Sequence, residues 1–209
     1  MADDQDDGLF QKVHNFICGS GGFVELPVLF RRPAPLGSRK SAPESRKWLN
    51  NRSEFAFVKD HNGEDKGVRI NLRKKICQQY VVKGSCRRGQ NKCKHWHICK
   101  SFIEEECNGA CGLSHDFHDH GNDNKLKELG LEKYSNGSLR KIIAWSLPTI
   151  CELYLRSECK YDKCPYLHVC AKEALGLACD CSLSHSLTDC HNMNILKEYD
   201  LVPLINICV

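Results

Sequence analysis

Apolar residues near the start of the chain recur at the three- and four-residue spacing of one helical face. This set consists of Leu9, Phe10, Val13, Phe16 and Ile17. The segment 19–22 then reads Gly-Ser-Gly-Gly, and such a run ends a helix because glycine disfavours helical backbone. We therefore predict one helix before Gly19 and a second, short helix over 24–30, which ends before Pro33.

A third helix and a β-hairpin are expected next. Ser41 and Glu44 have the spacing of a capping box, which marks the start of a helix. Apolar and polar residues then alternate in 55–57 and again in 68–72, on either side of an Asn-Gly turn. Three helices followed by a hairpin predict a small winged-helix-like domain over residues 1–75.

The third helix of this domain is basic, because it carries Arg46, Lys47 and Arg52. In a winged helix such charges serve nucleic-acid binding. They also fit an ordinary solvated face on a packing or partner-binding module. We favour the second interpretation for this helix.

Beyond residue 76, cysteines and histidines at regular intervals dominate the pattern. They form four sets of three cysteines and one histidine, which we number fingers 1 to 4. Such a CCCH set fills the tetrahedral shell of Zn²⁺ and leaves no open position for an activated water. Only Ile98 or Val169 separates one finger from the next, so we expect two linked pairs. The expected ligands are Cys77, Cys86, Cys93 and His97; Cys99, Cys107, Cys111 and His115; Cys151, Cys159, Cys164 and His168; and Cys170, Cys179, Cys181 and His185.

Finger 4 is the least regular of the four, because a single residue separates Cys179 from Cys181. Cys190 and His191 are alternative ligands. We favour Cys181, since its three-residue interval to His185 matches the other fingers.

The chain contains 15 cysteines, and a disulfide framework is the alternative explanation for so many. Disulfides need an oxidising compartment. The acidic start of the chain, 1–8, lacks the apolar core of a signal peptide, so we expect a reducing compartment. The cysteines are therefore predicted to hold four structural Zn²⁺ ions that supply much of the folding free energy.

A repeat of seventy residues links the two finger pairs. The Leu-Ser-His at 113–115 matches that at 183–185, and a Leu-Lys-Glu motif follows each at the same offset. The duplicated unit is a finger pair with a following helix that braces it. We expect these units over 76–150 and 151–209, so the fold class is α+β and zinc-dependent.

Composition adds a candidate surface. The net charge is only +4, but residues 66–100 contain eleven lysines and arginines and no acidic residue, as a phosphate-binding surface requires. Interleaved aromatic residues suit unstacked bases, although each could instead pack on its own zinc core. The candidate RNA contacts are Lys74, Lys75, Tyr80, Lys83, Arg87, Arg88, Lys94, Trp96, Lys100, Phe102, Arg156, Lys160, Tyr161, Lys163 and Tyr166.

Two function classes are disfavoured. No apolar run approaches the roughly 20 residues of a membrane span, so no membrane partner is expected. No paired carboxylates, nucleophile motif or phosphate loop stands out, so we do not expect an enzyme. A zinc-stabilised protein-interaction scaffold remains the alternative to an RNA-binding protein.

Four CCCH fingers in two linked pairs, preceded by a winged-helix-like domain, resemble the N-terminal RNA-binding region of the zinc-finger antiviral protein family. That family has CCCH-finger relatives among the PARP-type ADP-ribosyltransferases. The resemblance implies single-stranded RNA binding, a role in antiviral defence, innate immunity or stress response, and antiviral or RNA-decay partners. It implies a cytoplasmic location, with the nucleus as an alternative. It also raises the alternative that the chain is the targeting region of a longer ADP-ribosyltransferase.

The sequence departs from that family in finger 2, where the resemblance implies a pocket that selects a CG dinucleotide. The matching stretch 108–110 reads Asn-Gly-Ala, which offers few side chains to hold a base. The acidic run 104–106 adds negative charge near any bound phosphate. We therefore expect RNA binding with relaxed base selectivity.

Overall fold

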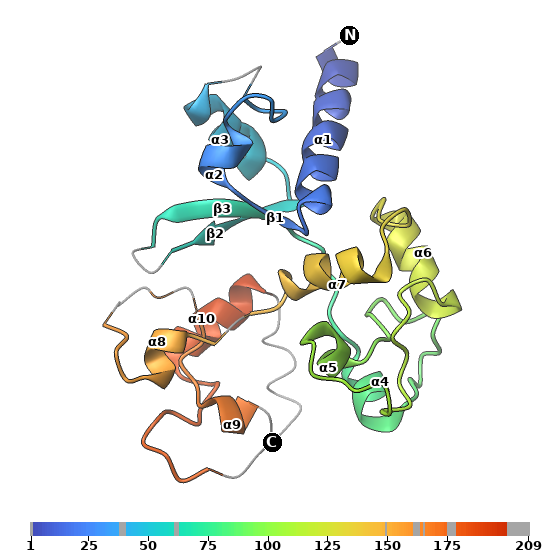
Figure 1. Ribbon diagram of the computed structural model, residues 1–209, viewed down its shortest axis with the longest axis vertical. Coiled ribbons are helices and arrows are strands. Elements are labelled where there is room, and N and C mark those ends of the chain that lie inside the picture. The colour runs from blue at the N-terminus through green and yellow to red at the C-terminus, as the bar shows by residue number, and fades with distance from the viewer. Residues whose placement is uncertain are drawn as a thin grey trace. The chain divides into compact units, whose positions relative to one another are not determined.

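The computed structural model describes residues 2–37, 41–60, 63–148, 150–160, 164, 166–174 and 179–199. The chain forms two compact units (Figure 1). One comprises Met1–Ala56 with Val68–Ser146, and the other Phe57–Gly67 with Leu147–Val209. Across the described ranges, no helix has both the length and the apolar character needed to cross a membrane.

The first predicted helix is present as α1 (Ala2–Gly19), and it buries Leu9, Val13 and Ile17 on the expected face. The predicted helix over 24–30 is wrong in its first part. Its start is a short strand, β1 (Phe23–Glu25), and only α2 (Leu26–Leu29) is helical. The amide of Ile70 donates to the carbonyl of Gly22 at 3.0 Å, so pairing with a distant strand overrides the local apolar pattern.

The third helix and the hairpin are also formed. Helix α3 (Ala42–Asn50) starts with the predicted capping box, in which the Ser41 amide donates to Glu44 Oε2 at 2.9 Å. Strands β2 (Phe55–Lys59) and β3 (Asp65–Ile70) join β1 in one sheet of order β1-β3-β2. The fold is thus a mixture of helices with a small sheet.

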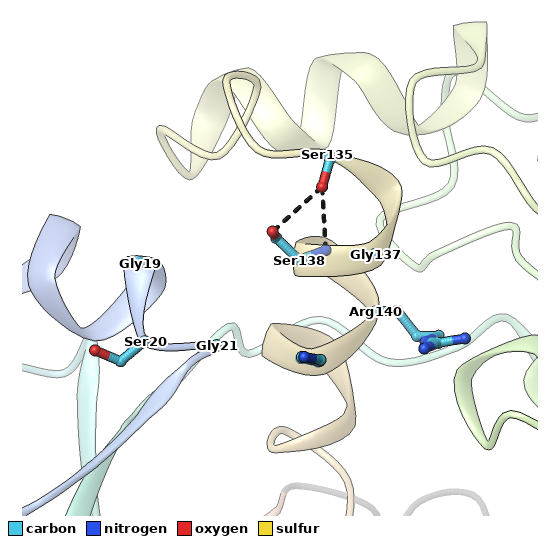
Figure 2. Close-up of a pocket in the computed structure, with 8 residues that line it drawn as sticks. Gly19, Ser20, Gly21, Ser135, Gly137, Ser138 and Arg140 are labelled. Carbon is cyan, nitrogen blue, oxygen red and sulfur yellow. Dashed lines mark hydrogen bonds between the residues drawn. The ribbon is translucent and has the colours of Figure 1, made fainter.

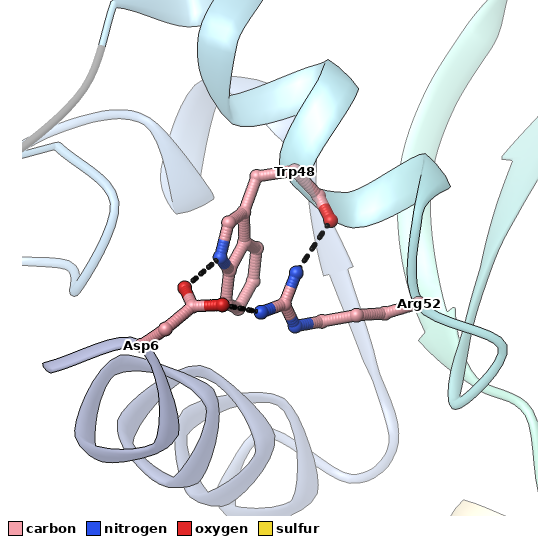
Figure 3. Close-up of polar contacts among 3 residues, drawn as sticks. All are labelled: Asp6, Trp48 and Arg52. Carbon is pink, nitrogen blue, oxygen red and sulfur yellow. Dashed lines mark hydrogen bonds and ion pairs between the residues drawn. The ribbon is translucent and has the colours of Figure 1, made fainter. Parts of the chain in front are cut away.

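Figure 3 shows how the end of α3 is held against α1. The guanidinium of Arg52 lies 4.0 Å from the centroid of the Trp48 ring and forms an ion pair with Asp6. Asp6 also accepts a hydrogen bond of 2.6 Å from Trp48 Nε1. Arg52 is therefore already engaged within this unit, which supports the packing interpretation for this cation.

The first finger pair and the segment after it contain α4 (Gln78–Lys83), α5 (Lys100–Ile103), α6 (His120–Glu128) and α7 (Asn136–Ala144). Helix α7 packs against both α1 and α5. The Phe23 and Trp145 rings stack with centroids 4.3 Å apart, and Lys133 Nζ donates to Asn15 Oδ1 at 2.7 Å. These contacts join the N-terminal elements to the first finger pair in one compact unit. The domain boundary expected near residue 76 stays a prediction.

The second unit contains α8 (Glu152–Leu155), α9 (Ala171–Ala174) and α10 (Cys190–Glu198). Its apolar core brings together Leu167 of finger 3 and the linker residue Val169 with Ile195 and Leu196 from α10. The helix after the second finger pair therefore packs on finger 3, as the repeat in the sequence led us to expect.

Candidate zinc centres and nucleic-acid surface

The structure brings together each of the four predicted ligand sets. Within each set, one donor atom from every residue lies within 4.8 Å of the others. Finger 4 gathers Cys170, Cys179, Cys181 and His185. The alternative His191 instead has its Nε2 2.9 Å from the carbonyl oxygen of Tyr166. Three sulfurs and one imidazole are a closed structural zinc set, so the four clusters fit four zinc ions.

Buried imidazoles support this fit. Both ring nitrogens of His97 and Nε2 of His168 are buried and have no hydrogen-bond partner among the described residues. An unpaired buried nitrogen costs about 1 to 3 kcal/mol, and a metal ion would satisfy it. Burial lowers the pKa of both histidines, so each ring is neutral at pH 7 and keeps a lone pair for the metal.

The cysteine thiols must lose their protons to bind zinc. Burial raises the pKa of Cys77 and Cys99 to about 11, and that of Cys164 to about 12. A backbone hydrogen bond at Leu113 lowers the pKa of the exposed Cys111 to about 7. Zinc therefore has to displace protons from the buried thiols, and its affinity rises with pH.

In fingers 1 to 3 an aromatic ring supports the histidine ligand. The first cysteine of each finger is the N-cap of a short helix, and the third residue of that helix carries the ring. The stacked pairs are Tyr80 on His97, Phe102 on His115 and Tyr154 on His168, with centroids 4.9, 4.7 and 4.5 Å apart. Finger 4 has a glutamate at this position in the sequence, and its His185 is exposed. A Cys-x-x-aromatic signal could have identified this role from the sequence.

This arrangement corrects two predicted RNA contacts. Tyr80 is 5% exposed and Trp96 is 0% exposed, so neither ring is accessible to a base. Trp96 instead packs edge-on against Phe117. Phe102 is half-buried, with one face on His115. Packing on the zinc core, the alternative considered for these rings, accounts for all three.

One asparagine in each repeat has a structural role that the sequence pattern did not reveal. Asn122 in α6 is fully buried; its Oδ1 accepts from the His97 amide and its Nδ2 donates to the His97 carbonyl, both at 3.0 Å. Asn192 in α10 makes the same pair of bonds to His168, at 2.7 and 3.0 Å. Each bracing helix therefore fixes the backbone of a zinc ligand. The Asp-x-x-Asn repeated at 119–122 and 189–192 was the available signal.

Most of the predicted basic contacts lie on the surface. The exposed members are Lys83, Arg87, Arg88, Lys94, Lys100, Arg156 and Lys160. Burial, followed by the charges of Lys75 and Arg88, lowers the pKa of His95, which indicates positive potential around finger 1. Lys75 itself is half-buried.

The remaining predicted contacts differ in their surroundings. Lys74 has a side chain only 15% exposed, and its Nζ lies 2.7 Å from Glu128 Oε2, so it is partly neutralised. Tyr166 is half-buried, and burial raises its pKa. Tyr161 and Lys163 lie outside the described residues.

Finger 2 has its nearby cations paired with the acidic run. Lys100 Nζ lies 3.5 Å from Glu104 Oε1, and Arg140 Nη2 lies 2.6 Å from Glu105 Oε1. The Arg140 guanidinium also lies 5.7 Å from the centroid of the Phe102 ring. Finger 2 therefore offers less uncompensated positive charge than finger 1.

A cavity of about 520 Å³ lies between the end of α1 and the start of α7. Figure 2 shows its polar side chains. Ser135 Oγ accepts from the Ser138 amide at 3.4 Å and lies 3.2 Å from Ser138 Oγ, as a helix cap does. Arg140 Nη2 donates to Glu105 Oε1, so the two serine hydroxyls and this end of the guanidinium already have partners within the chain. We assign no ligand to this cavity.

Comparison with known proteins finds relatives that are named as CCCH-type zinc-finger proteins. No protein-family model matches the chain. It is 29% identical over 145 residues to the human protein named zinc finger CCCH-type antiviral protein 1-like, covering 61% of this chain and 46% of that protein. The mouse protein of the same name is 27% identical over 146 residues, covering 61% of this chain and 47% of the relative.

A third relative is human protein mono-ADP-ribosyltransferase PARP12. It is 24% identical over 213 residues, which cover 91% of this chain and 30% of PARP12. The chain thus spans less than half the length of each of these relatives. The expected resemblance is confirmed: the chain is related in sequence to zinc finger CCCH-type antiviral protein 1-like proteins and to PARP12.

Proposed function

We propose that this protein binds single-stranded RNA through the basic surface of finger 1, and that binding requires zinc. The exposed cations of that finger carry the proposal. Lys83, Arg87, Arg88 and Lys92 are all exposed, and none forms an ion pair with a carboxylate among the described residues. Uncompensated cations on a rigid support attract a phosphate backbone and release its counterions.

Single strands suit this surface better than a duplex. CCCH fingers are compact modules held by metal, and α4 and α5 have only 6 and 4 residues, which is short for a helix that reads a major groove. Specific recognition of RNA by small modules targets unstacked bases. We further propose that the fingers act as two linked pairs and that the N-terminal elements form a winged-helix domain with a packing role.

We propose relaxed base selectivity. Finger 2 pairs Lys100 and Arg140 with its own glutamates, and its loop at 108–110 offers few groups that could read a base edge. Competition between matched oligonucleotides with and without CG steps tests this proposal. We expect a preference below about tenfold, and a larger one would contradict it.

The relatives support a biological setting for this activity. Two of them carry "antiviral protein" in their names, and we propose an antiviral or stress-response role in the cytoplasm with RNA-decay partners. The transferase activity in the third name is that of PARP12. For this chain we propose a binding role, because closed zinc sites offer no coordination position for a reacting water.

Charge reversal tests the RNA surface. The variant carrying Lys83→Glu, Arg87→Glu and Arg88→Glu is expected to bind all RNA sequences more weakly and to the same degree, since phosphate contacts carry no base information. The salt dependence of log affinity is expected to flatten by about 0.7 for each lost contact. Lys12→Glu, at an exposed position of α1, is the matched control.

Lys47→Glu tests the alternative in which α3 binds RNA, because only in that case would a charge reversal on α3 weaken RNA binding. An unchanged affinity in the triple variant would overturn the proposal. Little binding by the unmodified protein at any salt concentration would favour the scaffold.

A further inference from the structure

The backbone of one residue, Ser114, is hydrogen-bonded to both fingers of the first pair. Ser114 directly precedes the finger 2 ligand His115. The Ser114 amide donates to the hydroxyl of Tyr80 at 2.8 Å, and its carbonyl accepts from the Cys99 amide at 2.9 Å. Tyr80 comes from finger 1, whereas Cys99 is the first ligand of finger 2. The backbone of Ser114 is thus held by both fingers.

The same arrangement recurs in the second pair. The Ser184 amide donates to the Tyr154 hydroxyl at 2.7 Å, and the Ser184 carbonyl accepts from the Cys170 amide at 2.8 Å. Ser184 precedes the ligand His185. Both copies of the repeat retain the same bonds, so the contact is a regular part of the unit.

Each tyrosine therefore contacts a ligand of its own finger and the residue that precedes the histidine ligand of the next finger. The ring of Tyr80 stacks on His97 with an interplanar angle of 11°, and its hydroxyl accepts from the amide of Ser114, the residue before His115. When zinc holds His97, the ring is fixed and the hydroxyl orders the loop that carries His115. Such ordering lowers the entropy cost of closing the second site.

We propose that Tyr80 and Tyr154 couple zinc binding within each pair, so that loading one finger raises the affinity of its neighbour. The coupling is reciprocal, as linkage requires for two binding equilibria. Ile98 and Val169, the single residues between linked fingers, are 0% exposed, which leaves this junction little freedom to adjust. The two tyrosines act as positioning residues for the ligand set of the neighbouring finger.

Finger 2 provides an internal contrast. Its stacked ring is Phe102, which lies on His115 with an interplanar angle of 9° but has no hydroxyl. Stacking on the ligand therefore does not itself need a hydroxyl. The hydroxyl occurs in fingers 1 and 3, the fingers that have a linked finger directly after them.

The test uses the full zinc-loaded chain and a graded zinc chelator. Cysteine alkylation, read by peptide mass spectrometry, reports each finger separately because bound thiolates are protected. Tyr80→Phe keeps the ring and removes only the hydroxyl. It is expected to expose Cys107 and Cys111 of finger 2 at about fivefold lower chelator, the effect of one net hydrogen bond, and to leave Cys179 and Cys181 unchanged.

Tyr154→Phe is the matched variant in the second pair. It is expected to expose Cys179 and Cys181 at lower chelator and to leave Cys107 and Cys111 unchanged. Tyr134→Phe removes a hydroxyl outside the fingers and serves as the control. In a Cys86→Ser background, Tyr80→Phe is expected to cause little further loss at finger 2, since finger 1 no longer binds zinc.

Either of two results would overturn the coupling. One is a Tyr80→Phe effect confined to Cys77, Cys86 and Cys93, which would reduce the tyrosine to a support for its own finger. The other is no change in any cysteine. Should Tyr80→Phe fail to fold, Tyr154→Phe tests the same claim in the second pair. None of these results depends on RNA binding.

Discussion

Replacing Asn122 by alanine would remove the bond pair that holds the backbone of His97. Both groups of His97 that Asn122 serves lie in a buried part of finger 1, and the hydrogen bonds are 3.0 Å long. The Asn122→Ala change leaves a buried amide and a buried carbonyl unpaired. At about 1 to 3 kcal/mol for each of these two groups, the folding free energy of the first finger pair is expected to fall by about 2 to 6 kcal/mol.

Pulse alkylation across a urea series in excess zinc measures this loss. After digestion, the cysteines of the two finger pairs lie on different proteolytic peptides, so the unfolding transition of each pair is measured separately. We expect Asn122→Ala to lower the midpoint of the first pair and to leave that of the second unchanged, with Asn192→Ala giving the reverse. A shift below about 0.5 kcal/mol, or equal shifts in both pairs, would refute the assignment of these asparagines.

Three further predictions concern other parts of the chain. Gly22→Ala is expected to lower the free energy of unfolding by about 1 to 3 kcal/mol, because Gly22 has φ +92° and an added Cβ would lie 2.7 Å from Ile142 Cα. An added Cβ at Gly19 would meet nothing within 4 Å, so Gly19→Ala is the tolerated control. Thermal unfolding measures both. Burial lowers the pKa of His14, so the folded state binds fewer protons there than the unfolded state, and stability is lost as the pH falls below about 6.5. His14→Phe is expected to reduce this loss of unfolding free energy at low pH, as measured by urea unfolding. Glu105→Gln frees Arg140 from its ion pair and is expected to raise RNA affinity and to steepen the salt dependence of that affinity. Glu106 is exposed and forms no ion pair in the described chain, so Glu106→Gln is expected to raise RNA affinity less.

Local patterns in the sequence predicted the elements that depend on nearby residues. The apolar face of α1, the capping box of α3 and the hairpin all follow from spacings within a few residues. The ligand sets were equally accessible, because zinc chemistry restricts the residue types and their intervals. The structure gathers each predicted set into one cluster.

The features that were missed depend on distant partners. Strand β1 has 3 residues, and it is defined by pairing with β3 more than by its own composition. Asn122 appeared to be an ordinary polar helix residue, since its partner His97 lies 25 positions earlier in the chain. Tyr80 lies within a basic stretch that suggested RNA stacking, and its burial follows from contacts with His97 and Ser114.

Zinc-dependent binding of single-stranded RNA can be measured as the affinity of the zinc-loaded chain for a fluorescent single-stranded RNA pool. The affinity is measured at two salt concentrations, before and after chelation and again after zinc is restored. We predict binding that weakens as salt rises, disappears with the metal and returns with it. Binding that is unaffected by chelation, or equal at both salt concentrations, would contradict the account.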